Sequence, residues 1–286
     1  MNAAGTAGGA VDERSDGRRF AVGVARAFGA AILFSLPLLM TMEMWSLGFY
    51  MDRLRLALFM VAMLPLLIVV DHYSGFQKTV TWLDDAVDAT VAYGVGVVTS
   101  AVVLAAMGIV DLQMPVSEIV GKVALQSVPA SFGAVLAASQ LGGVGANRDD
   151  KAELRRGGYR VELLFMLAGA VFMAFNVAPT EEMLLIAYSM TPWHGLALMA
   201  LSLGLMHAFV YAMEFRGAPE RSVASPALSL FLRFTVVGYA VAVAVSAYVL
   251  WTFGRFDETA LATCLMYTLV LAFPASLGAA AARVIL

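Results

Sequence analysis

Residues 27–42 of the chain read AFGAAILFSLPLLMTM, and residues 91–110 read VAYGVGVVTSAVVLAAMGIV. Neither stretch contains a charged side chain. A helix of roughly 20 apolar residues crosses the hydrocarbon core of a bilayer, which is about 30 Å thick. Strands of a membrane β-barrel would instead alternate polar and apolar residues over segments of about 10 residues, and these stretches do not alternate. They therefore predict transmembrane helices.

The composition of the whole chain agrees with these two stretches. Of 286 residues, 61% are hydrophobic and 14% are charged, whereas soluble proteins carry roughly 25% charged residues. The net charge of −3 argues against a nucleic-acid partner. One cysteine, Cys264, and three scattered histidines give no pattern for a disulfide, a metal site or a cofactor. The partner that this composition predicts is the lipid bilayer.

Eight apolar stretches are long enough to span the membrane, so we expect an all-α polytopic membrane protein. The expected spans are 22–44, 54–73, 86–110, 115–140, 159–178, 192–213, 226–252 and 258–284. Asp52 and Thr191 stand where side chains cap the second and sixth of these helices. Residues 1–19 are predicted to be a disordered cytoplasmic tail and residues 142–158 a charged cytoplasmic linker.

The distribution of Lys and Arg predicts the orientation. Fourteen of the eighteen basic residues fall on one side of the expected spans, and cytoplasmic loops carry the excess of positive charge. Both termini are then cytoplasmic in the inner (plasma) membrane, which agrees with an even number of spans. The other side has four basic residues: Arg53, Arg55, Lys122 and Arg255.

The most specific feature of the sequence is an internal repeat. Residues 41–44, TMEM, align with residues 180–183, TEEM, at an offset of 139 (180 − 41). Residues 129–133, PASFG, align with residues 274–278, PASLG, at an offset of 145 (274 − 129). Self-similarity in this order is the signature of a duplicated unit.

The repeat predicts two tandem four-helix units, at 20–141 and 159–286. Because each unit has an even number of helices, both enter the membrane in the same direction. The units should then be related by an axis along the membrane normal. Glu43 and Glu182 are expected to lie at equal depth near the outer surface and to approach one another.

The Thr-x-Glu pairs are the candidate ion or proton site: Thr41 and Glu43 in the first unit, and Thr180, Glu181 and Glu182 in the second. An unpaired carboxylate near hydrocarbon costs several kcal/mol unless it is neutralised. One of two close carboxylates should therefore hold a proton, or both should hold a cation. The alternative is structural, since negative charge in the first turn stabilises a short helix.

Two other polar features have simpler interpretations. Small residues allow close approach of membrane helices, and this is the role we expect for Pro129, Ser131, Gly133, Pro274, Ser276 and Gly278. Asp84, Asp85 and Asp88 form an acidic group before the third helix, which we interpret as a solvated helix start.

The chain resembles a bacterial family of integral membrane proteins classed as a domain of unknown function, of the 2391 type. The resemblance lies in residues 36–45, LPLLMTMEMW, in residues 176–182, NVAPTEE, and in residues 73–76, YSGF. It covers nearly the whole chain. It implies a helical membrane protein and no particular activity.

Residues 178–182, APTEE, are also similar to the first motif of the intramembrane CAAX-type proteases, and His207 is similar to their second. Those enzymes use Glu and His residues to activate water. The match then fails, because Ile186 stands where that motif has an arginine and Leu203 stands where a phenylalanine is expected. No histidine remains for the third motif.

These observations favour a non-enzymatic transporter or channel for a cation or proton, because repeats in transporters place a site at their interface. A non-catalytic membrane scaffold or sensor is the alternative, and a CAAX-protease-like enzyme ranks below both. A homo-oligomer is compatible with the sequence, which identifies neither the solute nor the driving ion.

Overall fold

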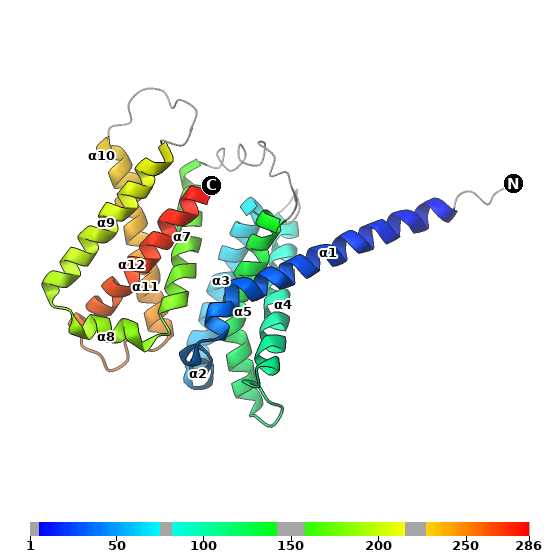
Figure 1. The fold of residues 1–286 in the computed structure, drawn as a ribbon, viewed down its shortest axis with the longest axis horizontal. Coiled ribbons are helices and arrows are strands. Elements are labelled where there is room, and N and C mark those ends of the chain that lie inside the picture. The colour runs from blue at the N-terminus through cyan, green and yellow to red at the C-terminus, as the bar shows by residue number, and fades with distance from the viewer. Residues whose placement is uncertain (1–5, 75–81, 142–157, 215–226, 286) are drawn as a thin grey trace.

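The computed structural model describes residues 6–74, 82–141, 158–214 and 227–285, and all regular elements within these ranges are helices (Figure 1). The first group is α1 Thr6–Leu39, α2 Met42–Tyr50, α3 Arg53–Ser74, α4 Trp82–Ala106 and α5 Val116–Leu141. The second is α7 Gly158–Val177, α8 Glu181–Ser189, α9 Pro192–Glu214, α10 Ala227–Leu230, η1 Phe231–Val236, α11 Val237–Thr252 and α12 Leu261–Ile285. The linker predicted at 142–158 lies, except for Gly158, outside the described residues.

Six of the described helices are long and apolar enough to cross a membrane: α1, α3, α4, α7, the helix formed by η1 and α11, and α12. A seventh is added if α8 and α9, which are bent by 118° at their junction, count as one broken span. The helix α5 is not among these six, and its first half carries Glu118, Lys122 and Gln126. The expected number of eight therefore stays a prediction.

The helices form two groups that are each organised around their last member. The helix α5 contacts α1, α2, α3 and α4. The helix α12 contacts α7, α8, α9 and α11 in the same way. Each group thus contains one central helix, and a nine-residue helix (α2 or α8) follows the first long one.

The first expected span differs from the structure at both ends. The run 22–44 is not one helix, because α1 ends at Leu39 and α2 begins at Met42. Pro37 has no N–H for the helical ladder, and Thr41 then adopts an extended backbone with φ −98° and ψ 118°. At its other end α1 begins at Thr6, within the tail predicted to be disordered. Extending an established helix needs no new nucleus, so the apolar span can propagate into polar sequence.

The short helices expose large apolar and aromatic side chains. Phe49 and Tyr50 at the end of α2 are exposed, as are Tyr188 of α8 and Trp193 at the start of α9. Figure 1 shows both short helices at the same end of the bundles. Aromatic side chains favour the boundary between water and lipid, so this end of the protein has the character of a membrane interface.

The helices α4 and α11 end in two turns of the same type. Gly108 and Gly254 have φ +70° and +72°, the left-handed conformation that glycine adopts without strain. The N–H of Ile109 donates to Leu104 O at 2.9 Å, and the N–H of Arg255 donates to Leu250 O at 2.9 Å. These bonds define a Schellman cap. The two turns lie 146 residues apart in the sequence (254 − 108).

Glycines of the two repeated motifs lie at equivalent helix contacts. A Cβ added at Gly133 of α5 would lie 2.7 Å from Ala30 O of α1. A Cβ added at Gly278 of α12 would meet the backbone of Gly169 in α7, and residue 169 is residue 30 plus the repeat offset of 139. Both contacts therefore bring the central helix against the backbone of the first helix in its group.

The serines of these motifs do not bond across the helix contact. Ser131 Oγ donates to Ser127 O at 2.6 Å, and Ser276 Oγ donates to Phe273 O at 2.7 Å, each within its own helix. Both side chains are fully buried, and Pro129 and Pro274 lie inside the helices two residues earlier. A hydroxyl that bonds its own backbone needs no partner helix.

A π-helical segment interrupts the helix before α11. In η1, Phe231–Val236, one backbone carbonyl is bound from outside, since Tyr159 Oη donates to Arg233 O at 2.7 Å. The Thr235 side chain lies 3.1 Å from His207 Nδ1 of α9. Insertions of this kind are frequent at functional sites.

Candidate functional site

The carboxylates of the Thr-x-Glu motifs lie in the first turns of the short helices. Glu43 is the second residue of α2 and is half-buried, whereas Glu181 and Glu182 begin α8 and are exposed. Neither Glu43 nor Glu182 forms an ion pair or a side-chain hydrogen bond with the described residues. Each stands where the N-terminal end of the helix dipole favours negative charge.

The threonine hydroxyls of these motifs bind the ends of the preceding helices. Thr41 Oγ1 donates to Pro37 O at 2.5 Å, and Thr180 Oγ1 donates to Val177 O at 2.8 Å. Neither hydroxyl caps the short helix that follows it. The hydroxyls and the carbonyls at both helix breaks therefore form hydrogen bonds with one another. Fewer oxygen atoms remain to bind a cation than the sequence suggested.

The short helices pack within their own groups. The helix α2 contacts α1 and α5, and α8 contacts α12. The expected approach of Glu43 to Glu182 therefore stays a prediction. Among the described residues no group of three or more His, Cys, Asp or Glu side chains has the arrangement of a metal site.

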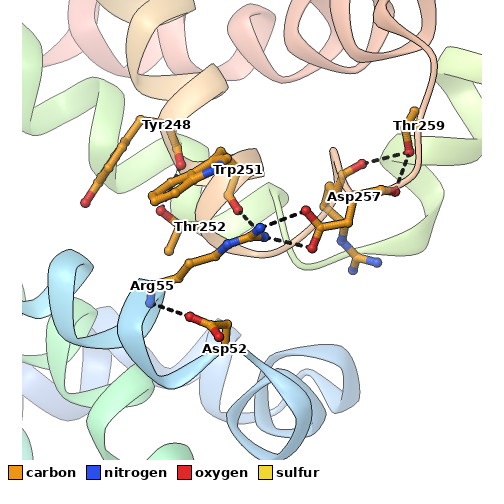
Figure 2. Close-up of polar contacts among 8 residues, drawn as sticks. Asp52, Arg55, Tyr248, Trp251, Thr252, Asp257 and Thr259 are labelled. Atoms are coloured by element: carbon orange, nitrogen blue, oxygen red, sulfur yellow. Dashed lines mark hydrogen bonds and ion pairs between the residues drawn. The ribbon is translucent and has the colours of Figure 1, made fainter.

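An ion pair joins the two groups at the end where the short helices lie. Arg55 of α3 donates from Nη1 to Asp257 Oδ2 and from Nη2 to Asp257 Oδ1, each at 2.8 Å, although 202 residues separate them (Figure 2). The same guanidinium donates to Trp251 O at 3.1 Å and lies 5.1 Å from the centre of the Trp251 ring. The predicted cap by Asp52 is confirmed, since its Oδ1 accepts from the Arg55 N–H at 2.9 Å.

An aromatic cluster lies next to this ion pair, between the two groups. The ring of Phe59 from α3 stacks on Phe175 of α7, with ring centres 5.2 Å apart and planes within 6°. Phe253 packs edge-on against both rings, and Tyr248 of α11 lies 6.3 Å from Phe59. Phe59, Phe175 and Phe253 are buried. The cluster and the ion pair together form the junction between the two groups.

The other basic residues at this end form hydrogen bonds or ion pairs with loops and helix ends. Arg53 donates to the carbonyls at the end of α2, with Nη1 at 3.0 Å from Gly48 O. Arg255 donates to Pro179 O, just before α8. Lys122 of α5 lies 2.6 Å from Glu118 Oε1. The described contacts thus engage all four basic residues that the sequence places on the less basic side.

A family model described as "Putative integral membrane protein (DUF2391)" matches residues 23–286 of the chain. The chain belongs to this family. A comparison with curated proteins and with solved structures finds no match. The expected family is confirmed, and with it the coarse prediction of a helical integral membrane protein.

In this DUF2391 protein the helix geometry disfavours the protease-like alternative. Glu182 is the second residue of α8, whereas His207 stands 15 residues (207 − 192) beyond the start of α9. At 1.5 Å per residue this places His207 about 22 Å along α9. The side chain of His207 contacts Thr235 and Phe231 of η1.

At the opposite end of α3, the acidic group that was expected to be a solvated helix start is exposed at Asp84 but buried at Asp85. Asp85 of α4 is 1% exposed, and its Oδ2 lies 2.6 Å from His72 Nδ1. Asp71 is 5% exposed. His72 also stacks on Trp82, with ring centres 4.4 Å apart. Asp85 is therefore a buried partner of His72 and no solvated helix start, a pairing between two helices that local sequence does not reveal.

Proposed function

We propose that this DUF2391 protein transports a small cation or a proton across the inner membrane of the cell. The observation that carries the proposal is the narrow junction between two helix groups that otherwise pack within themselves. The groups meet mainly where α3 contacts α7 and α11. Two bundles with such a junction can rock about it and expose a site alternately to the two sides.

The proposal includes a tandem repeat of two four-helix units with eight spans. The matching Schellman turns at Gly108 and Gly254 support the repeat, as do the matching backbone contacts at Gly133 and Gly278. The helix α5, together with the bent pair α8 and α9, brings the six candidate spans to eight. With eight spans, both termini lie on one side, which the distribution of basic residues makes cytoplasmic.

In this mechanism the Arg55–Asp257 pair closes the outer side of the junction. The two side chains are 23% and 55% exposed, so the pair is accessible to water and contributes little to stability. An accessible pair of this kind can break and re-form at small cost in free energy. Glu43 and Glu182 lie at the same end, and we assign them the attraction and exchange of the cation or proton, with Thr41, Thr180 and Glu181 beside them.

We propose no enzymatic activity, and the alternative remains a non-catalytic scaffold or sensor. The observation in favour of that alternative is the local use of the motifs: both threonine hydroxyls bind backbone carbonyls, and the carboxylates lie in first turns. If this local role is the whole role of the motifs, the same residues stabilise helix breaks and carry nothing across the membrane.

The deciding experiment is flux into proteoliposomes that contain a pH dye, tested across a panel of monovalent and divalent cations. We expect flux with the unaltered protein and a changed rate or pH dependence in the double variant Glu43→Gln and Glu182→Gln. Glu258→Gln is the matched control, because Glu258 is an exposed carboxylate near the same end but outside the motifs. Absence of flux for every cation would refute transport, and unchanged flux in the double variant would refute the assigned site.

A second arm tests the rocking motion. A bismaleimide that links Arg55→Cys to Asp257→Cys should stop flux, and a reducible cross-linker of similar length should allow recovery on reduction. Cys264 is replaced by Ala in this background, because it is the one cysteine of the chain. Undiminished flux in the linked protein would show that the junction does not open during transport.

A further inference from the structure

The junction between the two helix groups uses different faces of the two groups. The first group contributes Arg55 and Phe59 of α3, the helix after its short one. The second contributes Phe175 of α7, the helix before its short one, together with Phe253 and Asp257, which follow α11. If the two groups are repeats, the junction is a head-to-tail contact, because each group uses a face that the other does not.

The counterparts of the junction residues in the other group are exposed. Phe175 is 2% exposed, and its counterpart at the offset of 139 is Leu36, which is 39% exposed. Phe253 is 3% exposed, and its counterpart at the offset of 146 is Met107, which is 43% exposed. Tyr248 corresponds to Val102, which is 52% exposed. The face formed by α1 and α4 in the first group thus corresponds to the α7–α11 face of the second group. Among the described elements, no helix packs against this α1–α4 face.

The same relation holds for the polar pair. Arg55 corresponds to His194 at the start of α9, and Asp257 corresponds to Asp111 after α4. Both counterparts are exposed. Figure 1 places α9 and α4 at opposite edges of the molecule. One edge of the molecule therefore exposes the counterpart of Arg55, and the opposite edge exposes the counterpart of Asp257.

The imidazole of His194 is oriented for a contact of this kind. Its Nδ1 accepts from the Thr191 N–H at 3.1 Å, and Thr191 Oγ1 lies 3.0 Å from the same atom. Because Nδ1 is the acceptor, the proton of the neutral ring is on Nε2. Among the described residues, the Nε2–H of this exposed side chain then has no acceptor. Asp111 is an exposed carboxylate, of which Oδ1 accepts only from the nearby Gln113 N–H among the described contacts.

We propose that a second copy of this chain binds head to tail, with its α1–α4 face against α9 of the first copy. His194 Nε2–H of one copy then donates to the Asp111 carboxylate of the next, as Arg55 donates to Asp257 within the chain. This assembly rests on the repeat in the proposed function but not on transport. Units that enter the membrane in the same direction keep both copies upright in one bilayer, and a head-to-tail contact extends to a row or closes into a ring.

The alternative occupant of these faces is lipid. Leu36, Met107 and Val102 are smaller than the aromatic residues that they replace, so the contact between copies buries less area per side chain than the junction within the chain. The contact between copies should therefore be weaker than the junction, and it is best tested by cross-linking in the membrane.

The test uses two differently tagged copies in one membrane, one with Asp111→Cys and the other with His194→Cys, both with Cys264→Ala. A bismaleimide should shift the mixed pair from monomer to dimer on a denaturing gel. The matched controls are two copies with Asp111→Cys and two copies with His194→Cys, which should stay monomeric. Arg55→Cys and Asp257→Cys in one chain serve as the folding control, since they should cross-link within the monomer.

Each outcome decides the proposal. A dimer from the mixed pair alone supports the head-to-tail contact. Dimers from the same-site pairs would overturn it in favour of a two-fold contact or of random collision. No mixed dimer, while the folding control cross-links, would mean that lipid covers these faces. Because cross-linking needs no flux, a missing dimer with normal flux refutes the assembly alone, and a dimer without flux leaves the assembly intact and refutes transport.

Discussion

Replacing Gly133 by Ala should increase the distance between α1 and α5 in the first group. The added Cβ would lie 2.7 Å from Ala30 O, a backbone atom that cannot rotate away, and 2.7 Å from Phe34 Cβ. Ordinary contact begins at 3.4 Å, so α1 and α5 must move apart by about 0.7 Å (3.4 − 2.7). A gap of roughly 0.5–1 Å forfeits a quarter to a half of the dispersion energy of each contact that it opens.

The net cost of this substitution follows from two opposing effects. Overpacking in a tight contact costs about 1–3 kcal/mol, and Ala gains about 0.5–1 kcal/mol over Gly inside a helix. We expect Gly133→Ala to lower the free energy of unfolding by about 1–2 kcal/mol. Gly94→Ala in α4 is the matched control, because nothing lies within 4 Å of its added Cβ, and it should be neutral or slightly stabilising.

The measurement is equilibrium unfolding of the detergent-solubilised protein with increasing mole fraction of a denaturing detergent, followed by circular dichroism. The comparison between the two glycine variants removes the effect of helix propensity, which both share. A Gly133→Ala protein as stable as the Gly94→Ala protein would refute the reasoning, since the backbones of α1 and α5 could then not be in close contact.

Three further sets of substitutions test the junction and the π-helix. Phe59→Ala should cost about 3–5 kcal/mol in the same assay, whereas Leu33→Ala, at a side chain that is 69% exposed, should be nearly neutral; equal losses would place Phe59 outside the junction. Arg55→Gln and Asp257→Asn should each cost no more than about 1 kcal/mol, because the pair is accessible to water, and the double variant should cost no more than the larger single loss. Additive losses would show that the two side chains act separately. Tyr159→Phe should cost about 1 kcal/mol by removing the hydroxyl that binds a carbonyl of the π-helix, and an unchanged midpoint would mean that water replaces this bond.

Local chemistry in the sequence predicted the helical class, several helix starts and the family. Asp52 caps α3 as expected, and α9 begins at Pro192, immediately after Thr191. These features depend on residues within one turn of each other. The expected span 22–44 runs through the break between Leu39 and Met42, because hydropathy reads an apolar run in the same way through a sharp turn. The alternative role of Glu43, in the first turn of a short helix, already implied a break there. Pro37 was the available signal.

Contacts across the chain could not be predicted in this way. Arg55 reads as an ordinary residue of a helix start, and its partner Asp257 lies 202 residues away. His72 and Asp85 lie in different helices and are joined only by the packing of α3 on α4. The Thr-x-Glu motifs can be located in the sequence, but their neighbours depend on how the two groups pack, which a motif does not contain.

The helix α5 has a consequence for the order in which the protein enters the bilayer. Its first half carries two charged side chains and one amide, and almost every side chain from Gly121 to Val135 is buried by neighbouring helices. A segment with Glu118, Lys122 and Gln126 in its first half partitions poorly into lipid on its own. It should therefore remain at the insertion machinery until α1 and α4 are available to receive it. The earlier helices of the first group then surround α5 in place of lipid. If synthesis stops before α5 is complete, the first group lacks its central helix.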